Sequence, residues 1–372
     1  MEEGRRNNFD ALRLVAAASV VFSHSFLIAN GTQDHEPLIW LTGNQSILGL
    51  VGVFVFFAVS GFLVTQSFEE TDDPWRFLAK RALRIFPGLF VATLLSAFVL
   101  APLVTSLPLG AYLSRFEPYE YVVGNTLLDQ TVHELPGVRF VDNQVGLEVN
   151  GSLWTLRYEF VMYLMVLALG VLRLLSVRVA LLLVAFGIVD LHFSLLDPTE
   201  KWGWFFQLLS NWGWLVAFFA AGMVLYKLRY TRIFDGRIAL LALAGLILSV
   251  PLRQFLSLFP LFGCYLALWL ALTPRLPVIP AARFGDLSYG IYIYGWPAEQ
   301  AAVWLLGGRA AWWQVFLLAL PAAAALAFLS WHLIERPALR LKPRARNSPA
   351  TQRRETGVEV SPAASMASIG QV

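Results

Sequence analysis

The sequence has few charged residues and almost no cysteine. Only 14% of its 372 residues are Asp, Glu, Lys or Arg, whereas soluble globular domains carry about a quarter. The single cysteine, Cys264, excludes a scaffold held by disulfides. No glycine repeat occurs, and 13 Trp and 28 Phe exclude a collagenous or disordered chain. The net charge of +3 is too small to indicate nucleic-acid binding.

The residues that replace the missing charges are hydrophobic, at 57% of the chain. Since about twenty apolar residues cross a bilayer, this composition suffices for about ten transmembrane helices. Apolar runs of that length are found at approximately 9–28, 47–66, 84–104, 153–172, 178–195, 204–226, 238–253, 256–273, 287–306 and 311–333.

The distribution of cations gives these runs an orientation, because Lys and Arg favour the cytoplasmic side. With ten spans and a cytoplasmic N-terminus, 22 of the 28 Lys and Arg residues fall in cytoplasmic segments and 6 outside. Merging the seventh and eighth runs, which meet near Pro251 and Pro260, would place the following cations on the wrong side. The sequence therefore predicts an all-α, polytopic protein of the cytoplasmic (inner) membrane, with both termini in the cytoplasm.

The chain is expected to contain one folded unit and one tail. The membrane domain is predicted over residues 1–342, and the segment 343–372, rich in Ser, Pro and Arg, is predicted to be a disordered cytoplasmic tail. The loop at about 105–152 is acidic and is the one predicted extracytoplasmic segment large enough to shape a binding site. A solvated connector is the alternative interpretation of that loop.

Ionisable residues inside apolar runs are costly, so they are the first candidates for function. Arg13 and His24 are eleven residues apart on one face of the first run, ~16 Å along a helix. Asp10 shares that face and can pair with Arg13. Arg13 alone is typical of a snorkelling anchor, whereas His24 between two serines indicates a polar cavity and a general base.

Three further groups of polar residues interrupt the apolar runs. Arg81 and Arg84 share a helix face and can donate forked hydrogen bonds to phosphates, although such clusters commonly anchor a helix at the cytoplasmic surface. Glu159 lies deep in the fourth run and needs a partner or a watery cavity. Glu335 lies near the cytoplasmic end of the tenth run, where Pro337 is expected to end the helix.

Taken in order, these motifs resemble the acyltransferase 3 family of integral membrane acyltransferases. The resemblance covers residues 5 to about 341 and rests on six motifs placed on successive helices. They are 6–13 (RNNFDALR), 52–63 (GVFVFFAVSGFL), 81–87 (RALRIFP), 152–160 (SLWTLRYEF), 287–292 (LSYGIY) and 334–337 (IERP).

The resemblance implies an O-acyltransferase that moves an acyl group, usually acetyl, from cytoplasmic acyl-CoA to a hydroxyl of an extracytoplasmic glycan. It implies His24 as the base, with Arg13 and Glu335 as further catalytic residues, and Arg81 and Arg84 as ligands of the CoA phosphates. It further implies substrate contacts from a second set of residues. These are Asp10, Trp154, Glu159 and Tyr289.

The chain departs from the family pattern in two respects. Gly295 stands where the family often has His, and no SGNH-type hydrolase domain follows the last run. Any transfer is then completed by the membrane domain or by a separate periplasmic partner. Acyl-CoA enters as a donor substrate, and neither a metal nor a permanently bound cofactor is expected.

Two other classes of function remain open at this stage. Intramembrane charges also mark transport pathways, so a membrane transporter or exporter is the alternative, although the chain has no internal repeat. A subunit of a polysaccharide export complex that has lost activity is the third interpretation, which the absent His at Gly295 keeps open.

Overall fold

The structure, a computed structural model, describes residues 7–71, 73–129, 133–140, 145, 147–196 and 204–342. Within these ranges the chain forms helices joined by loops, with an isolated β-bridge between Thr105 and Val138. The helices are α1 (Phe9–Asn30), α2 (Pro37–Leu41), α3 (Leu48–Glu69), α4 (Pro74–Leu95), η1 (Ser96–Leu100), α5 (Ala101–Val104), α6 (Leu109–Leu113), α7 (Glu117–Thr126), η2 (Gly151–Leu153), α8 (Trp154–Val171), α9 (Val177–Leu196), α10 (Trp204–Lys227), α11 (Gly236–Ser249), α12 (Phe255–Leu258), α13 (Gly263–Leu272), η3 (Ala281–Phe284), α14 (Ser288–Leu305), α15 (Trp312–Ser330), η4 (Trp331–Glu335) and α16 (Arg336–Arg340).

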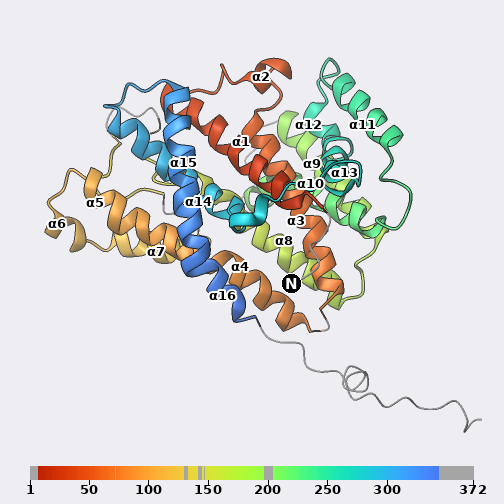
Figure 1. Ribbon diagram of the computed structural model, residues 1–372, viewed down its shortest axis with the longest axis horizontal. Coiled ribbons are helices and arrows are strands. Elements are labelled where there is room, and N and C mark those ends of the chain that lie inside the picture. Colours follow the sequence, from red (N-terminus) through yellow and green to blue (C-terminus); the bar gives the residue numbers. More distant parts are fainter. Residues whose placement is uncertain are drawn as a thin grey trace, which may run out of the picture.

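Helix α1 lies at the centre of the bundle, against α3 on one side and α14 and α15 on the other (Figure 1). Helix α3 continues this packing to α10, and α10 packs on α9. Small residues permit the close crossings, as is common between helices in membranes. A Cβ added at Gly52 of α3 would lie 2.7 Å from the carbonyl oxygen of Ala16.

Among the described residues, five helical segments are long and apolar enough to cross a membrane: 9–30, 48–69, 74–104, 151–171 and 312–340. The outward faces of the bundle expose large apolar side chains, which suit contact with lipid. Examples are Leu182, Leu241, Ile247, Leu248 and Leu317. The all-helical, membrane-embedded class is therefore confirmed.

Each of the ten predicted apolar runs contains a helix, but α11 and α13 have only 14 and 10 residues. Helices of that length are shorter than the roughly twenty residues that one span requires. The count of ten spans and the cytoplasmic position of both termini therefore stay predictions. The predicted tail 343–372 lies outside the described residues.

The expectation that Pro337 ends the last helix is wrong. The helix widens into the π turn η4 and continues as α16. Pro337 is the second residue of α16 and comes directly after the π turn, and π turns and prolines are both common sites of irregularity within long helices. The buried Glu335 closes the π turn and accepts a hydrogen bond of 3.0 Å from the Ser330 hydroxyl.

The loop between α5 and α8 has a small hydrophobic core of its own. Tyr112, Tyr121, Phe140 and Val149 are buried in it, and the Tyr112 hydroxyl donates to the Ala97 carbonyl at 2.7 Å. Helices α5, α6 and α7 extend from one side of the bundle (Figure 1). The described part of this loop is therefore a packed structure rather than a solvated connector.

The crossing of α3 and α10 depends on Gly61 of α3 and Gly222 of α10, each of which lies against the backbone of the other helix. A Cβ at Gly61 would lie 1.9 Å from the Phe219 carbonyl oxygen, and one at Gly222 would lie 2.0 Å from that of Ala58. We expect Gly61→Ala to force the helices apart and to lower the stability of the protein by about 1–3 kcal/mol.

Gly110→Ala in α6 is the matched control, because no atom lies within 4 Å of an added Cβ there. Both substitutions raise helix propensity, so thermal unfolding in detergent isolates the effect of the crossing. Equal unfolding temperatures for Gly61→Ala and the wild type would contradict this account of the crossing.

Candidate functional site

A cavity of about 260 Å³ opens among α1, α3, α4, α8 and α14, with the end of the described chain at its rim. We call it the basic cavity. Five of the residues predicted from the sequence line it: Arg13, Arg81, Arg84, Glu159 and Tyr289. The remaining polar lining consists of Ser60, Lys80, Thr155, Tyr163, Asp286, Tyr292 and Lys342.

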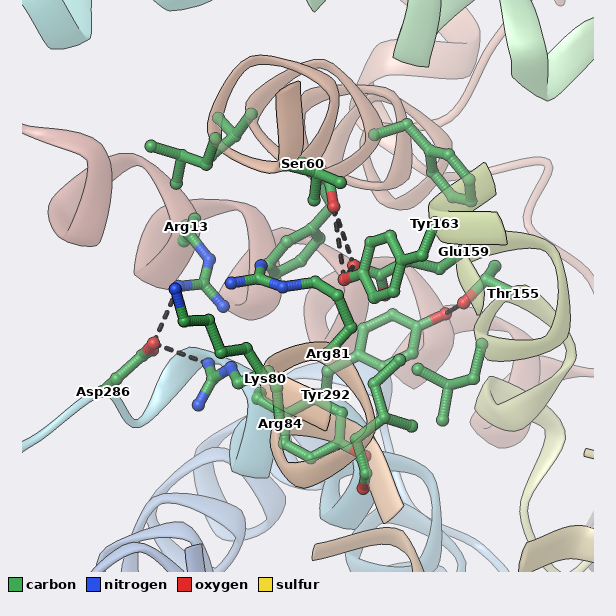
Figure 2. Close-up of a pocket in the computed structure, with 18 of the residues that line it drawn as sticks. Arg13, Ser60, Lys80, Arg81, Arg84, Thr155, Glu159, Tyr163, Asp286 and Tyr292 are labelled. Atoms are coloured by element: carbon green, nitrogen blue, oxygen red, sulfur yellow. Dashed lines mark hydrogen bonds and ion pairs between the residues drawn. The ribbon is translucent and has the colours of Figure 1, made fainter. Parts of the chain in front are cut away.

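One carboxylate joins two of the arginines across the cavity wall (Figure 2). Asp286 Oδ2 lies 2.7 Å from Arg13 Nη1 and 2.6 Å from Arg84 Nη2. Arg84 Nη1 also lies 3.4 Å from Oε2 of the buried Glu335. These contacts bind α1, α4, η4 and the segment before α14 into one network, so Glu335 acts here through Arg84 rather than from the cavity wall.

Asp286 was missed by sequence reasoning because it lies in a short polar segment before α14, where an acid is unremarkable. Burial raises the pKa of its carboxyl, but the charges of Arg13 and Arg84 and hydrogen bonds from Ser288 and Arg13 lower the pKa well below its usual range. The group is therefore ionised at neutral pH, and the stability it supplies is lost only as the pH falls through that lowered pKa.

Three cations of the basic cavity remain available to a ligand. Within the described parts of the chain, Lys80, Arg81 and Lys342 form no ion pair. The buried Arg81 Nε has no hydrogen-bond partner there. Partial burial and the charges of Arg81, Arg84 and Lys80 lower the pKa of Lys342. A bound anion would relieve the electrostatic repulsion among these cations.

The other end of the basic cavity is lined by hydroxyl groups and one carboxylate. Glu159 Oε1 accepts hydrogen bonds from the Ser60 hydroxyl at 2.9 Å and from the Tyr163 hydroxyl. Next to it, the Thr155 and Tyr292 hydroxyls are 2.6 Å apart. Figure 2 shows Arg81 between this group and the arginine pair at Asp286.

His24 lines neither this cavity nor the second one described below, but it has a buried acidic partner. Its Nδ1 lies 3.7 Å from Oε2 of Glu299, which is fully buried. Neither atom has another hydrogen-bond partner among the described residues. Ser25 donates to the second Glu299 oxygen at 2.9 Å, and the His24 ring meets the Trp296 ring edge-on at 4.8 Å between centroids.

Glu299 was also missed by sequence reasoning, although its acidic side chain within the apolar run 287–306 is a signal that could have identified it. It lies one turn after Gly295 on α14. A Cβ at Gly295 would lie 2.8 Å from Val21 of α1, so the two helices approach closely there. Glu299, and not residue 295, is the polar partner of His24.

A second cavity, of about 280 Å³, lies at the start of α8. We call it the polar cavity. It contains Trp154, one of the four predicted site residues that do not line the basic cavity. Its other lining residues are Leu89, Asn125, Leu128, Asp129, His133, Glu148, Asn150, Gly151 and Leu153. Asp10, also predicted to contact substrate, is exposed and lines neither cavity.

Contacts to α14 hold one wall of the polar cavity in place. The Asn150 side chain donates to the Ile293 carbonyl at 2.8 Å, and the Trp296 indole donates to the Glu148 carbonyl at 3.1 Å. Gln300 donates to the carbonyls of Val145 and Glu148 at 2.8 and 3.0 Å. The helix that carries Glu299 therefore also positions this loop.

Comparison with known proteins gives a consistent picture. The model of a family described as "Acyltransferase domain" matches residues 6–334. "Nodulation protein 10" of Rhizobium leguminosarum bv. viciae is 30% identical, with 91% of this chain and 95% of the relative covered. "O-acetyl transferase" of Shigella phage Sf6 is 27% identical, with 89% and 96% covered.

A third relative, from Komagataeibacter xylinus, is named as a candidate membrane-bound transacylase, BcsY. It is 24% identical, with 92% of this chain and 85% of the relative covered. No solved structure matches the chain significantly.

We expect Asp286→Asn to destabilise the protein by about 3 kcal/mol, because it leaves Arg13 and Arg84 facing each other without their shared counter-charge. Thermal unfolding of the purified protein in detergent measures this loss. The control is Glu117→Gln, whose ion pair with Arg115 is exposed and should contribute almost nothing. Equal effects of the two substitutions would refute a structural role for Asp286.

Proposed function

The chain belongs to the acyltransferase domain family, and from this premise we propose that it transfers an acetyl or similar acyl group from cytoplasmic acyl-CoA to a hydroxyl of an extracytoplasmic glycan. One observation supports this assignment above the others. A cavity lined by three cations that form no ion pair within the described chain also holds hydroxyl groups on α3, α8 and α14, and α14 carries Glu299, the buried partner of His24. A transporter of small molecules lacks this support, and membership of the family argues against it.

The donor is expected to enter the basic cavity with its phosphates at the rim. Arg81, Lys80 and Lys342 are the groups best placed to bind phosphates, because none of them forms an ion pair within the described chain. Arg84 and Arg13 share Asp286, so we assign them to shaping the cavity wall. The sequence-based assignment of Arg84 to the phosphates stays a prediction.

His24 is proposed as the general base for the acceptor hydroxyl. A carboxylate at Nδ1 fixes the tautomer of an imidazole and stabilises its protonated form, which is the role we give to Glu299. Nε2 then takes the hydroxyl proton as the oxygen attacks the thioester carbonyl. The C–S bond breaks, and the protonated imidazole returns its proton to the departing thiolate.

Arg13 and His24 are eleven positions apart, and this separation gives the depth that the donor has to cross. At ~16 Å along α1, this separation requires a long, narrow arm between the anionic head of the donor and its thioester. A pantetheine arm has this form. The names of two relatives, an O-acetyl transferase and a candidate transacylase, are consistent with such a reaction.

We predict that His24→Ala lowers glycan acylation at least 100-fold, in line with the loss of a general base, and that it leaves acetyl-CoA affinity within twofold. Glu299→Gln should lower the rate less and move the pH profile of the remaining activity. The measurements are acetyl groups per surface glycan by mass and CoA release by the purified protein. His35→Ala, at an exposed histidine, is the control, and full acylation by His24→Ala would rule out this mechanism.

Arg81→Ala should weaken acetyl-CoA binding about tenfold or more, because it removes charge-assisted hydrogen bonds. Titration calorimetry at two salt concentrations measures this effect. Arg115→Ala, at an exposed arginine, should bind as the wild type does. Unchanged affinity in Arg81→Ala would place the donor phosphates elsewhere.

The lowered pKa of Lys342 predicts a pH dependence of donor binding. A lysine is charged only below its pKa, so acetyl-CoA affinity should fall as the pH rises through this lowered pKa. Lys342→Arg should keep the affinity constant to higher pH, because arginine stays protonated. An identical pH dependence in wild type and Lys342→Arg would exclude Lys342 from the donor site.

A further inference from the structure

The basic and polar cavities lie end to end along the same two helices. On α4, Ile85 lines the basic cavity and Leu89, one turn later, lines the polar cavity. On α8, Thr155 belongs to the basic cavity and its neighbour Trp154 to the polar one. A single helical turn therefore separates the two spaces.

The two cavities differ in charge. The basic cavity is lined by five cations and two carboxylates. The described lining of the polar cavity contains Asp129, Glu148, two asparagines, His133 and Trp154, and no Lys or Arg. Carboxylates and amide oxygens accept hydrogen bonds from hydroxyl groups, and the same carboxylates repel phosphates and other anions.

Trp296 of α14 connects the polar cavity to the proposed base. Its indole N–H donates to the carbonyl of Glu148, a residue of the polar cavity, and its ring contacts the His24 ring. Tyr292, one turn earlier on α14, lines the basic cavity. Helix α14 therefore links both cavities to the contact between Trp296 and His24.

Two backbone features fix the shape of the polar cavity. Leu128 has a φ of 63°, a left-handed conformation that is costly for a leucine and is often found at functional sites. Gly151 has no room for a side chain, since a Cβ there would lie 2.6 Å from a Glu148 carboxylate oxygen and 2.8 Å from the Trp296 ring. Gly151 therefore lets the Glu148 carboxylate and the Trp296 ring both approach the main chain at the start of α8.

We propose that the polar cavity is the acceptor subsite and that it binds an uncharged sugar unit of the glycan. The inference rests on the proposed function. The Trp154 ring supplies an apolar face for the sugar, while Glu148 and Asp129 accept hydrogen bonds from its hydroxyl groups. The absence of Lys and Arg from the described lining disfavours a uronic or sialic acid. One sugar hydroxyl meets the thioester beside Trp296 and attacks its carbonyl carbon, and the hydroxyl proton passes to His24. The C–S bond then breaks, and the thiolate takes the proton from His24 and leaves as the free thiol of CoA.

The test uses the purified full-length protein in lipid nanodiscs, [¹⁴C]acetyl-CoA, and surface glycan isolated from cells in which the gene for this chain is deleted. Glu148→Gln and Trp154→Ala should each raise the KM for this glycan at least tenfold, while the Kd for acetyl-CoA stays within twofold. Glu120→Gln and Trp40→Ala, both at exposed positions, are the matched controls. Glu148→Gln preserves size, so it tests the proposal even where Trp154→Ala unfolds.

The outcomes separate this proposal from the proposed function. If the wild type transfers no label, the proposed function fails and the acceptor subsite fails with it. If the wild type transfers label and Glu148→Gln keeps a wild-type KM, the acceptor subsite is overturned and the function stands. A tenfold weaker Kd for acetyl-CoA at unchanged glycan KM would assign the cavity to the donor and overturn the proposal as well.

Digestion of the labelled glycan tests the charge argument separately. Label on a neutral sugar unit is the expected result. Label on a uronic or sialic acid would overturn the assignment of an uncharged acceptor.

Discussion

The shared ion pair at Asp286 is the interaction on which the arrangement of the basic cavity depends. Arg13 and Asp286 are 273 positions apart in the sequence, and Arg84 and Asp286 are 202 apart, yet one carboxylate oxygen holds both guanidinium groups. Two guanidinium groups that contact the same carboxylate oxygen would repel each other if that anion were absent. Together with Glu335, which also contacts Arg84, Asp286 neutralises Arg13 and Arg84 internally and leaves the charge of Lys80, Arg81 and Lys342 to face the cavity.

This arrangement sorts charge by depth within one helix bundle. Cations gather at the rim of the basic cavity, hydroxyl groups line its inner end, and acids with amides line the polar cavity one helical turn beyond. Such a gradient lets the two ends of a transfer reaction favour different chemical groups. In the proposed reaction it also separates the two substrates before they meet near His24, where the reacting atoms have to be brought together.

The sequence identified much of the fold and about half of the site. Long apolar runs and ordered motifs were sufficient for the helical membrane class and the family, and the rarity of intramembrane charge identified Arg13, Arg81, Arg84 and Glu159. Asp286 could not be found in this way, because it lies outside the apolar runs and is defined by partners that are distant in the chain. Glu299 lies inside the run 287–306, so the same criterion could have identified it, but its partner His24 is visible only in the folded structure.

Other features depended on local geometry that the sequence pattern does not encode. The π turn η4 is one example. The helix continues through it to Arg340, although a proline such as Pro337 ordinarily predicts the end of a helix. The separation of Trp154 from Thr155 into different cavities is another, since adjacent helical residues point in directions about 100° apart. The polar contacts that hold the loop before α8 bring together residues that share no motif.

The attachment of the loop before α8 to helix α14 affects how a protein of this kind can change its specificity during evolution. Asn150, Trp296 and Gln300 donate to main-chain carbonyls, and a carbonyl is present at every position whatever its side chain. The anchoring at Val145 and Glu148 is thus independent of loop side-chain identity. Substitutions can change the side chains that line the polar cavity while the main chain stays fixed to α14. In the proposed reaction, acceptor preference could thus change without changes to the helix bundle.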